Sequence, residues 1–127
     1  MPEPNRIRPT FFNLLRIAFP VGAVTSIGHR ISGVVLVFCA PVLIYLLDVS
    51  LRSAGDYERV RVVLDTVSAR GLVAVIVWAF AHHFFAGIRH LLMDIDVGSS
   101  LAVARRSAWL VNVAGVGVAL IGVGMLL

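Results

Sequence analysis

The chain has 127 residues, of which 59% are hydrophobic and 14% are charged, and its formal net charge is +4. A mean hydropathy of +0.94 lies well outside the range of water-soluble domains, and this length is enough for one domain. All eleven basic residues are arginines spread along the chain, which indicates a membrane protein and argues against a nucleic-acid-binding protein.

Three apolar segments are long enough to cross a membrane as helices. They cover roughly residues 21–47, 71–93 and 108–127, and a membrane-spanning helix needs about 20 residues. Strands are not expected, because a membrane barrel requires many alternating segments of about ten residues. The sequence therefore predicts an all-α integral membrane three-helix bundle, with residues 1–127 forming a single membrane-anchor domain.

The remaining segments are short. Residues 9–20 mix aromatic, aliphatic and basic side chains, which is typical of a short helix lying in the membrane interface. The connection 48–70 has a helical apolar rhythm, so we expect it to extend the second helix outside the bilayer. Six arginines lie on the N-terminal side of the membrane and four on the other side, which favours a cytoplasmic N-terminus.

Polar residues gather at one face of the predicted bundle. The first span begins on the side of the membrane where the second span ends, so residues near these two ends share a face. Ionisable side chains within membrane helices are costly and therefore indicate a functional site. The residues that share this face are Ser26, His29, Arg30, Arg89, His90 and Asp94.

The second span has the features of a haem-binding helix. His83 lies about 18 Å into the span, near the centre of the bilayer, and His90 lies about 10 Å further along the same side. A neutral imidazole at that depth can bind haem iron, while arginine and histidine nearer the surface pair with the propionates. His82 is a competing ligand, but it points about 100° away from His83. The chain has too few suitably placed ligands for both axial positions, so we expect the second from another subunit.

Ser26 and Arg30 lie four residues apart, on one side of the first span. A hydroxyl and a guanidinium at the edge of the membrane suit a lipophilic ligand with polar carbonyls, such as a quinone. The alternative is contact between Arg30 and a lipid phosphate. The spacing alone does not choose between these two interpretations.

Two motifs resemble signatures of a known family. Arg8-Pro9 followed by residues 26–33 (SIGHRISG) is similar to the N-terminal signature of the cytochrome b membrane-anchor subunit of succinate dehydrogenase, complex II. Residues 83–94 (HFFAGIRHLLMD) resemble the second signature of that family, with all its fixed positions present. The three spans and the length are also similar, so the resemblance covers nearly the whole chain.

The resemblance implies a role for each motif. His83 matches the axial ligand of haem b, whose other ligand comes from a second, smaller anchor subunit. Ser26 and Arg30 match residues that line the ubiquinone site beside the iron–sulfur subunit. His29, Arg30 and His90 match positions around the haem propionates. No catalytic residue is implied in this chain.

The resemblance also implies a setting for the chain. A flavoprotein subunit oxidises succinate at FAD, and iron–sulfur clusters pass the electrons to ubiquinone. The chain is then a subunit of succinate:ubiquinone oxidoreductase in the bacterial inner membrane, with the lipid bilayer and three other subunits as its partners and no nucleic acid. Two alternatives stay open: a fumarate reductase anchor that uses menaquinone, and a haem-free membrane scaffold or channel.

Overall fold

The protein is described by a computed structural model, which covers residues 18–126. Four helices follow one another along the chain: α1 (Val21–Arg52), α2 (Ala54–Leu64), α3 (Val67–Asp94) and α4 (Leu101–Leu126). Three of them, α1, α3 and α4, are long and apolar enough to cross a membrane, and no strand occurs among the described residues. The predicted all-α fold with three membrane-spanning helices is confirmed.

The helices continue beyond the apolar segments that marked them in the sequence. α1 ends at Arg52, α3 begins at Val67, and α4 begins at Leu101. The predicted interfacial segment 9–20 lies almost entirely outside the described residues. Only its last three residues are described, and they precede α1 without regular structure. That prediction stays untested.

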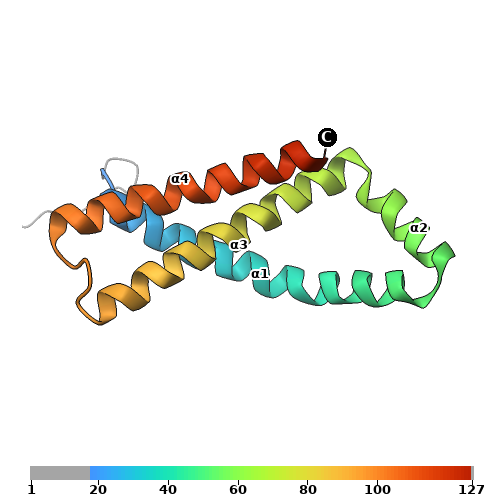
Figure 1. Ribbon diagram of the computed structural model, residues 1–127, viewed down its shortest axis with the longest axis horizontal. Helices are drawn as coiled ribbons and strands as arrows, with labels where there is room; N and C mark the ends of the chain where they lie inside the picture. Colours follow the sequence, from blue (N-terminus) through green and yellow to red (C-terminus); the bar gives the residue numbers. More distant parts are fainter. Residues whose placement is uncertain (1–17, 127) are drawn as a thin grey trace, which may run out of the picture.

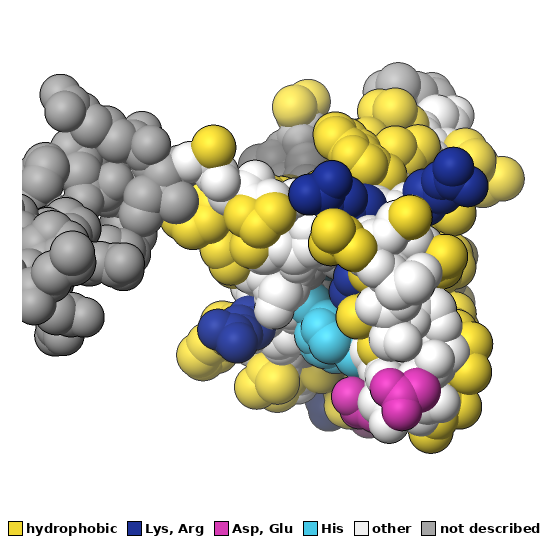
Figure 2. Space-filling view, turned by 90° about the vertical axis from the view of Figure 1, so that its left-hand side faces the viewer, with side chains coloured by type: hydrophobic (Ala, Val, Ile, Leu, Met, Phe, Trp, Pro, Cys, Tyr) yellow, Lys and Arg dark blue, Asp and Glu magenta, His cyan; other side chains and the backbone are white. Residues whose placement is uncertain are grey.

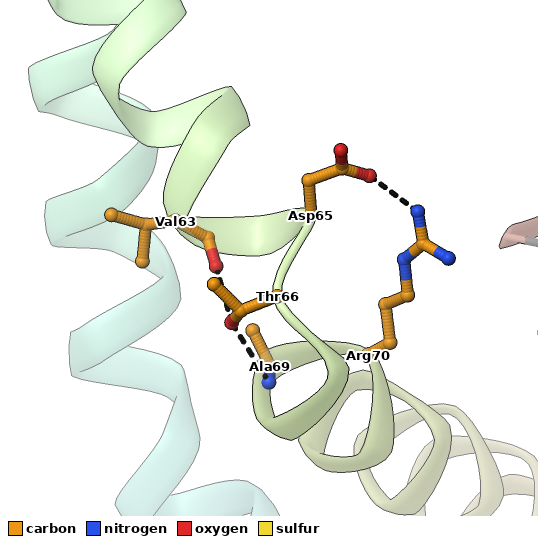
Figure 3. Close-up of polar contacts among 5 residues, drawn as sticks. All are labelled: Val63, Asp65, Thr66, Ala69 and Arg70. Atoms are coloured by element: carbon orange, nitrogen blue, oxygen red, sulfur yellow. Dashed lines mark hydrogen bonds and ion pairs between the residues drawn. The ribbon is translucent and has the colours of Figure 1, made fainter.

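The connection between the first two spans forms a helix of its own, so the expectation that it extends the second span is wrong. Thr66 separates α2 from α3, because its hydroxyl accepts a hydrogen bond from the Ala69 amide at 3.3 Å and donates one to the Val63 carbonyl at 2.8 Å (Figure 3). A threonine that caps a new helix start ends the preceding helix. Apolar periodicity alone did not reveal this break.

An ion pair spans the same junction. Arg70, in the first turn of α3, pairs with Asp65 at the end of α2 (Figure 3). The hydrogen bond and charge of Arg70 hold the pKa of Asp65 below its ordinary value of 3.8. A carboxyl whose pKa is lower in the folded state stabilises that state above its unfolded pKa, and this stabilisation is lost as pH falls through the folded pKa.

We therefore expect Asp65→Asn to loosen the junction slightly at neutral pH. Amides 66–70 should exchange hydrogen somewhat faster in the variant at pH 7. The difference should shrink as pH falls through the lowered pKa of the wild-type carboxyl, which lies below the ordinary value of 3.8. Asp48→Asn is a matched control, since it removes the pair with Arg52 and leaves this junction intact. Equal exchange in Asp65→Asn and wild type at pH 7 would contradict the prediction.

The helices α3 and α4 pack against each other, and α1 meets them only along its first half (Figure 1). α1 crosses α3 and also packs on α4, whereas its second half runs apart from them (Figure 1). The contact region holds small or short side chains, which allow membrane helices to approach closely. The buried residues there include Ala79, Ala86, Ala108, Thr25 and Ser32. Most large apolar side chains are exposed, as expected where lipid or other subunits cover a membrane protein.

Candidate functional site

His83 is held against the backbone of α1. Its Nδ1 lies 3.1 Å from the carbonyl oxygen of His29 and 3.3 Å from the hydroxyl of Ser32. A carbonyl oxygen only accepts hydrogen bonds, so Nδ1 carries the proton and Nε2 keeps its lone pair. This is the usual state of a histidine that binds a metal, in which one ring nitrogen binds and the other donates to an acceptor that fixes the ring. The residues present therefore fit one axial ligand of a haem.

Gly33 makes this close approach possible. A Cβ atom at position 33 would lie 2.9 Å from Cε1 and 3.3 Å from Nδ1 of His83. The structure also places the Ser32 hydroxyl beside the His83 ring nitrogen. Ser32 and the His29 carbonyl are thus ring-orienting groups that sequence reasoning missed, since only the crossing of α1 and α3 brings them to His83.

Three histidines form a stack that leads away from His83. The rings of His29 and His83 are 4.1 Å apart between centroids, and those of His29 and His90 are 4.9 Å apart. Nδ1 of His90 donates to the Ala86 carbonyl at 2.7 Å, which fixes the orientation of that ring. At the end of the molecule where α1 and α4 begin, a histidine lies among arginines (Figure 2). Of the residues predicted to share one membrane face, His29 and His90 do come together.

Ser26 and Arg30 are both accessible on the first half of α1. Ser26 is half-buried and Arg30 is exposed. Within residues 18–126, neither side chain makes a hydrogen bond or an ion pair. As far as residues 18–126 are concerned, both polar groups therefore keep their full hydrogen-bonding capacity.

His82 faces away from the histidine stack. Its side chain is 3% exposed and lies between Gly28 of α1 and Gly115 of α4, with the Trp78 ring 5.4 Å away. Nε2 donates to the Thr25 carbonyl at 3.4 Å, and Nδ1 has no hydrogen-bond partner among the described residues. An imidazole enclosed by three helices leaves no room for a macrocycle, which favours His83 over His82 as the haem ligand.

Arg89 differs from its expected place. The sequence predicts that Arg89 shares a membrane face with His90, but the Arg89 side chain turns toward α4. There its Nε donates to the Ser107 hydroxyl at 3.0 Å, and its Nη2 donates to the Ala104 carbonyl at 3.1 Å. The adjacent residues Arg89 and His90 point to different sides of α3 because consecutive helical residues are about 100° apart. Asp94, at the end of α3, is exposed.

The described residues contain no group of three or more histidine, cysteine, aspartate or glutamate side chains that would hold a metal ion. The site therefore offers a single imidazole nitrogen, Nε2 of His83, and the hydrogen bond at Nδ1 orients its ring. The rings of His29 and His90 stack in line with it. Such a site suits a metal that is already held by a macrocycle.

Comparison with known proteins identifies the family. Residues 4–123 match the family described as succinate dehydrogenase/fumarate reductase transmembrane subunit. The chain belongs to this family. The resemblance stated from the two sequence motifs is thereby confirmed, and membership agrees with an integral membrane protein that has three spanning helices.

Three relatives of the chain carry the name succinate dehydrogenase cytochrome b556 subunit. The relative from Coxiella burnetii is 40% identical over 113 residues, covering 86% of this chain and 88% of the relative. The relative from Rickettsia typhi is 30% identical over 86% of this chain and 85% of its own length. The relative from Paracoccus denitrificans is 29% identical over 80% and 78%, respectively.

Proposed function

We propose that this chain is the membrane-anchoring cytochrome b subunit of a succinate dehydrogenase, that it shares one haem b with a second anchor subunit, and that it helps to form a ubiquinone-reduction site. The observation that carries the proposal is the orientation of His83, whose Nδ1 is bonded to the His29 carbonyl while Nε2 is free to bind iron. The names of the relatives, which are cytochrome b subunits of succinate dehydrogenase, point to the same cofactor and complex.

His83 supplies one axial ligand, and the second anchor subunit supplies the other. When bound, the haem accepts and releases single electrons. His29 and His90 extend from His83 toward the membrane face where α1 begins, so their rings, with Arg30, are placed to pair with the propionates. The positive charge of Arg30 and a hydrogen bond from His29 offset the negative charge of two carboxylates at the edge of the membrane.

Ser26 and Arg30 form the part of the quinone site that this chain contributes. The Ser26 hydroxyl donates a hydrogen bond to one quinone carbonyl, and the Arg30 guanidinium stabilises the negative charge that develops on quinone oxygens during reduction. Neither side chain has a hydrogen-bond or ion-pair partner among the described residues, which supports a role in quinone binding over a structural role.

The complex around this chain contains a flavoprotein subunit with FAD and an iron–sulfur subunit, which deliver electrons from succinate. The exposed apolar second half of α1 supports an arrangement in which lipid and the second anchor subunit cover this chain. We place the complex in the bacterial inner membrane with the N-terminus of this chain in the cytoplasm, because arginines favour that side.

A second candidate is a fumarate reductase anchor that uses menaquinone, since the family description names both enzymes. The three relatives favour succinate dehydrogenase, because each carries that name. Assaying the purified complex in both directions with ubiquinone and menaquinone analogues distinguishes the two functions.

Replacing Ser26 by alanine tests the quinone site. We expect the rate of ubiquinone reduction by succinate to fall about tenfold, as expected for the loss of one hydrogen bond worth about 1.4 kcal/mol. Succinate oxidation with an artificial acceptor that takes electrons from the soluble subunits should stay unchanged. Ser50→Ala is the matched control, because Ser50 lies near the other end of α1 and bonds only to its own helix at Leu47. Equal loss in both assays would argue against the role of Ser26.

A further inference from the structure

A cavity of about 350 Å³ lies between α3 and α4 near the turn that joins them. Three of its α3 residues are Phe85, Ile88 and Leu92, which lie about 140–200° around the helix from His83. The cavity is therefore separate from the histidine stack. Its volume is within the range of small-molecule sites, about 300–1,000 Å³.

Arg89 brings a buried positive charge to this largely apolar cavity. The side chain is only 9% exposed, and its two hydrogen-bond partners, the Ser107 hydroxyl and the Ala104 carbonyl, are both neutral. In the part of the chain that the structure describes, every ion pair lies between Asp48 and Arg70, at the other end of the molecule. An arginine buried at membrane depth without an acidic partner is costly, and an anion beside it removes much of that cost.

The surroundings of Arg89 add further positive potential. Its partners lie in the first two turns of α4, and Nη2 is 3.9 Å from the position that a Cβ on Gly22 would occupy, in the first turn of α1. The first turns of two helices therefore lie beside this region, and helix N-termini favour anions. Arg105 and Arg106 are exposed on the same part of α4, which is typical of the headgroup level of a membrane.

We propose that this cavity binds an anionic phospholipid, with the phosphate against Arg89 and one acyl chain along the apolar wall formed by α3 and α4. A phospholipid meets both requirements of the site, because it supplies a negative charge at headgroup depth and a flexible apolar chain just below it. Arg89 lies about 7.5 Å before the end of α3, within reach of a lipid phosphate. The wall below it includes Phe85, Leu110, Val111 and Ala114.

The test uses the complete purified complex, stripped of lipid in detergent and titrated with phosphatidylglycerol or phosphatidylcholine, with bound lipid measured by native mass spectrometry. We expect wild type to bind phosphatidylglycerol at least about tenfold more tightly, and Arg89→Gln to remove that preference, because a charge-assisted bond to phosphate is lost. Ala114→Phe, which fills the cavity and keeps the arginine, should weaken binding of both lipids. Inorganic phosphate should not displace the lipid.

Two further variants keep the test decisive. Arg106→Gln is the matched control, since it removes an exposed arginine of α4 and should leave binding of phosphatidylglycerol unchanged. If the Arg89→Gln complex does not assemble, the test uses two other variants. Arg89→Lys keeps the charge but not the paired donors, and Ala114→Phe fills the cavity. The haem spectrum should not change in Ala114→Phe, because the cavity is on the opposite side of α3 from His83.

Several results would overturn the proposal. These are equal affinity of wild type for the two lipids, an equal effect of Arg106→Gln and Arg89→Gln, and undiminished lipid binding in Ala114→Phe. Cross-linking of the Leu92→Cys variant to a partner subunit in the intact complex would show that a protein helix covers the cavity instead.

Discussion

Replacing His83 by alanine is expected to abolish haem binding in the purified complex. The site offers one suitably oriented imidazole, and the variant loses the iron–nitrogen bond together with the hydrogen bond that fixes the ring. The Soret band per complex should fall to near background. The measurement is a reduced-minus-oxidised absorption spectrum normalised to the flavin content of the same sample.

His82→Gln is the matched control for this prediction. His82 is the neighbouring histidine but lies in the packed contact between α1 and α4, so its replacement should leave the Soret band in place. Adding free imidazole to the His83→Ala complex should restore part of the band, because a small ligand can enter the space left by the ring. A normal spectrum in His83→Ala, or loss of haem in His82→Gln alone, would transfer the ligand role to His82.

A substitution at Ser32, milder than the loss of His83 itself, tests how the His83 ring is oriented. Ser32→Ala removes a hydroxyl that lies 3.3 Å from His83 Nδ1 but leaves the His29 carbonyl as acceptor. The haem should therefore stay bound while its midpoint potential shifts, since partners of the distal ring nitrogen tune ligand basicity. The same potential in Ser32→Ala and wild type would mean that the carbonyl alone orients the ring.

The helical class and the number of spans were predictable because both follow from length and hydropathy. A run such as residues 31–47, which carries no charge, leaves a helix in lipid as the only stable form. The helix ends were less predictable. Thr66 stops one helix and starts the next through its own hydrogen bonds, and this local chemistry leaves no trace in hydropathy.

The sequence also allowed a prediction of which residues share a membrane face. It did not allow a prediction of which of their side chains touch. The up-and-down course of the chain places His29 and His90 at the same end as His83, and the structure stacks these three rings. The direction of Arg89 toward α4 depends on how α3 is rotated against its neighbours. That rotation is set by small residues at the crossings, and spacing along one helix carries little information about it.

Replacing Gly28 by alanine is expected to disrupt the crossing of α1 and α3. A Cβ at position 28 would lie 2.6 Å from His82 Nε2, which is too close for any real contact. The ring has little room to withdraw, because Gly115 of α4 is also close on its other side: a Cβ there would lie 3.2 Å from His82 Cβ. Overpacking of this kind costs about 1–3 kcal/mol.

This destabilisation should also affect the haem site. Gly28 and His82 lie where α1 and α3 cross, and the same two helices are joined by the hydrogen bond from His83 to the His29 carbonyl. We expect Gly28→Ala to lower the temperature at which the complex loses its haem absorbance on heating. Gly117→Ala is the matched control, since a Cβ at that position meets no atom within 4 Å in the described chain. Equal melting of the two variants would contradict the prediction.

A double mutant separates this clash from a general intolerance of change at position 28. Shortening His82 to alanine removes the atom that the new methyl group meets, and it breaks only one long hydrogen bond, at 3.4 Å, because Nδ1 has no partner among the described residues. Gly28→Ala should therefore destabilise the His82→Ala complex much less than it destabilises wild type, which gives a favourable coupling energy for the pair. Independent, additive effects would mean that Gly28 is required by a neighbour other than His82, and that the close approach of α1 to α3 rests on other contacts.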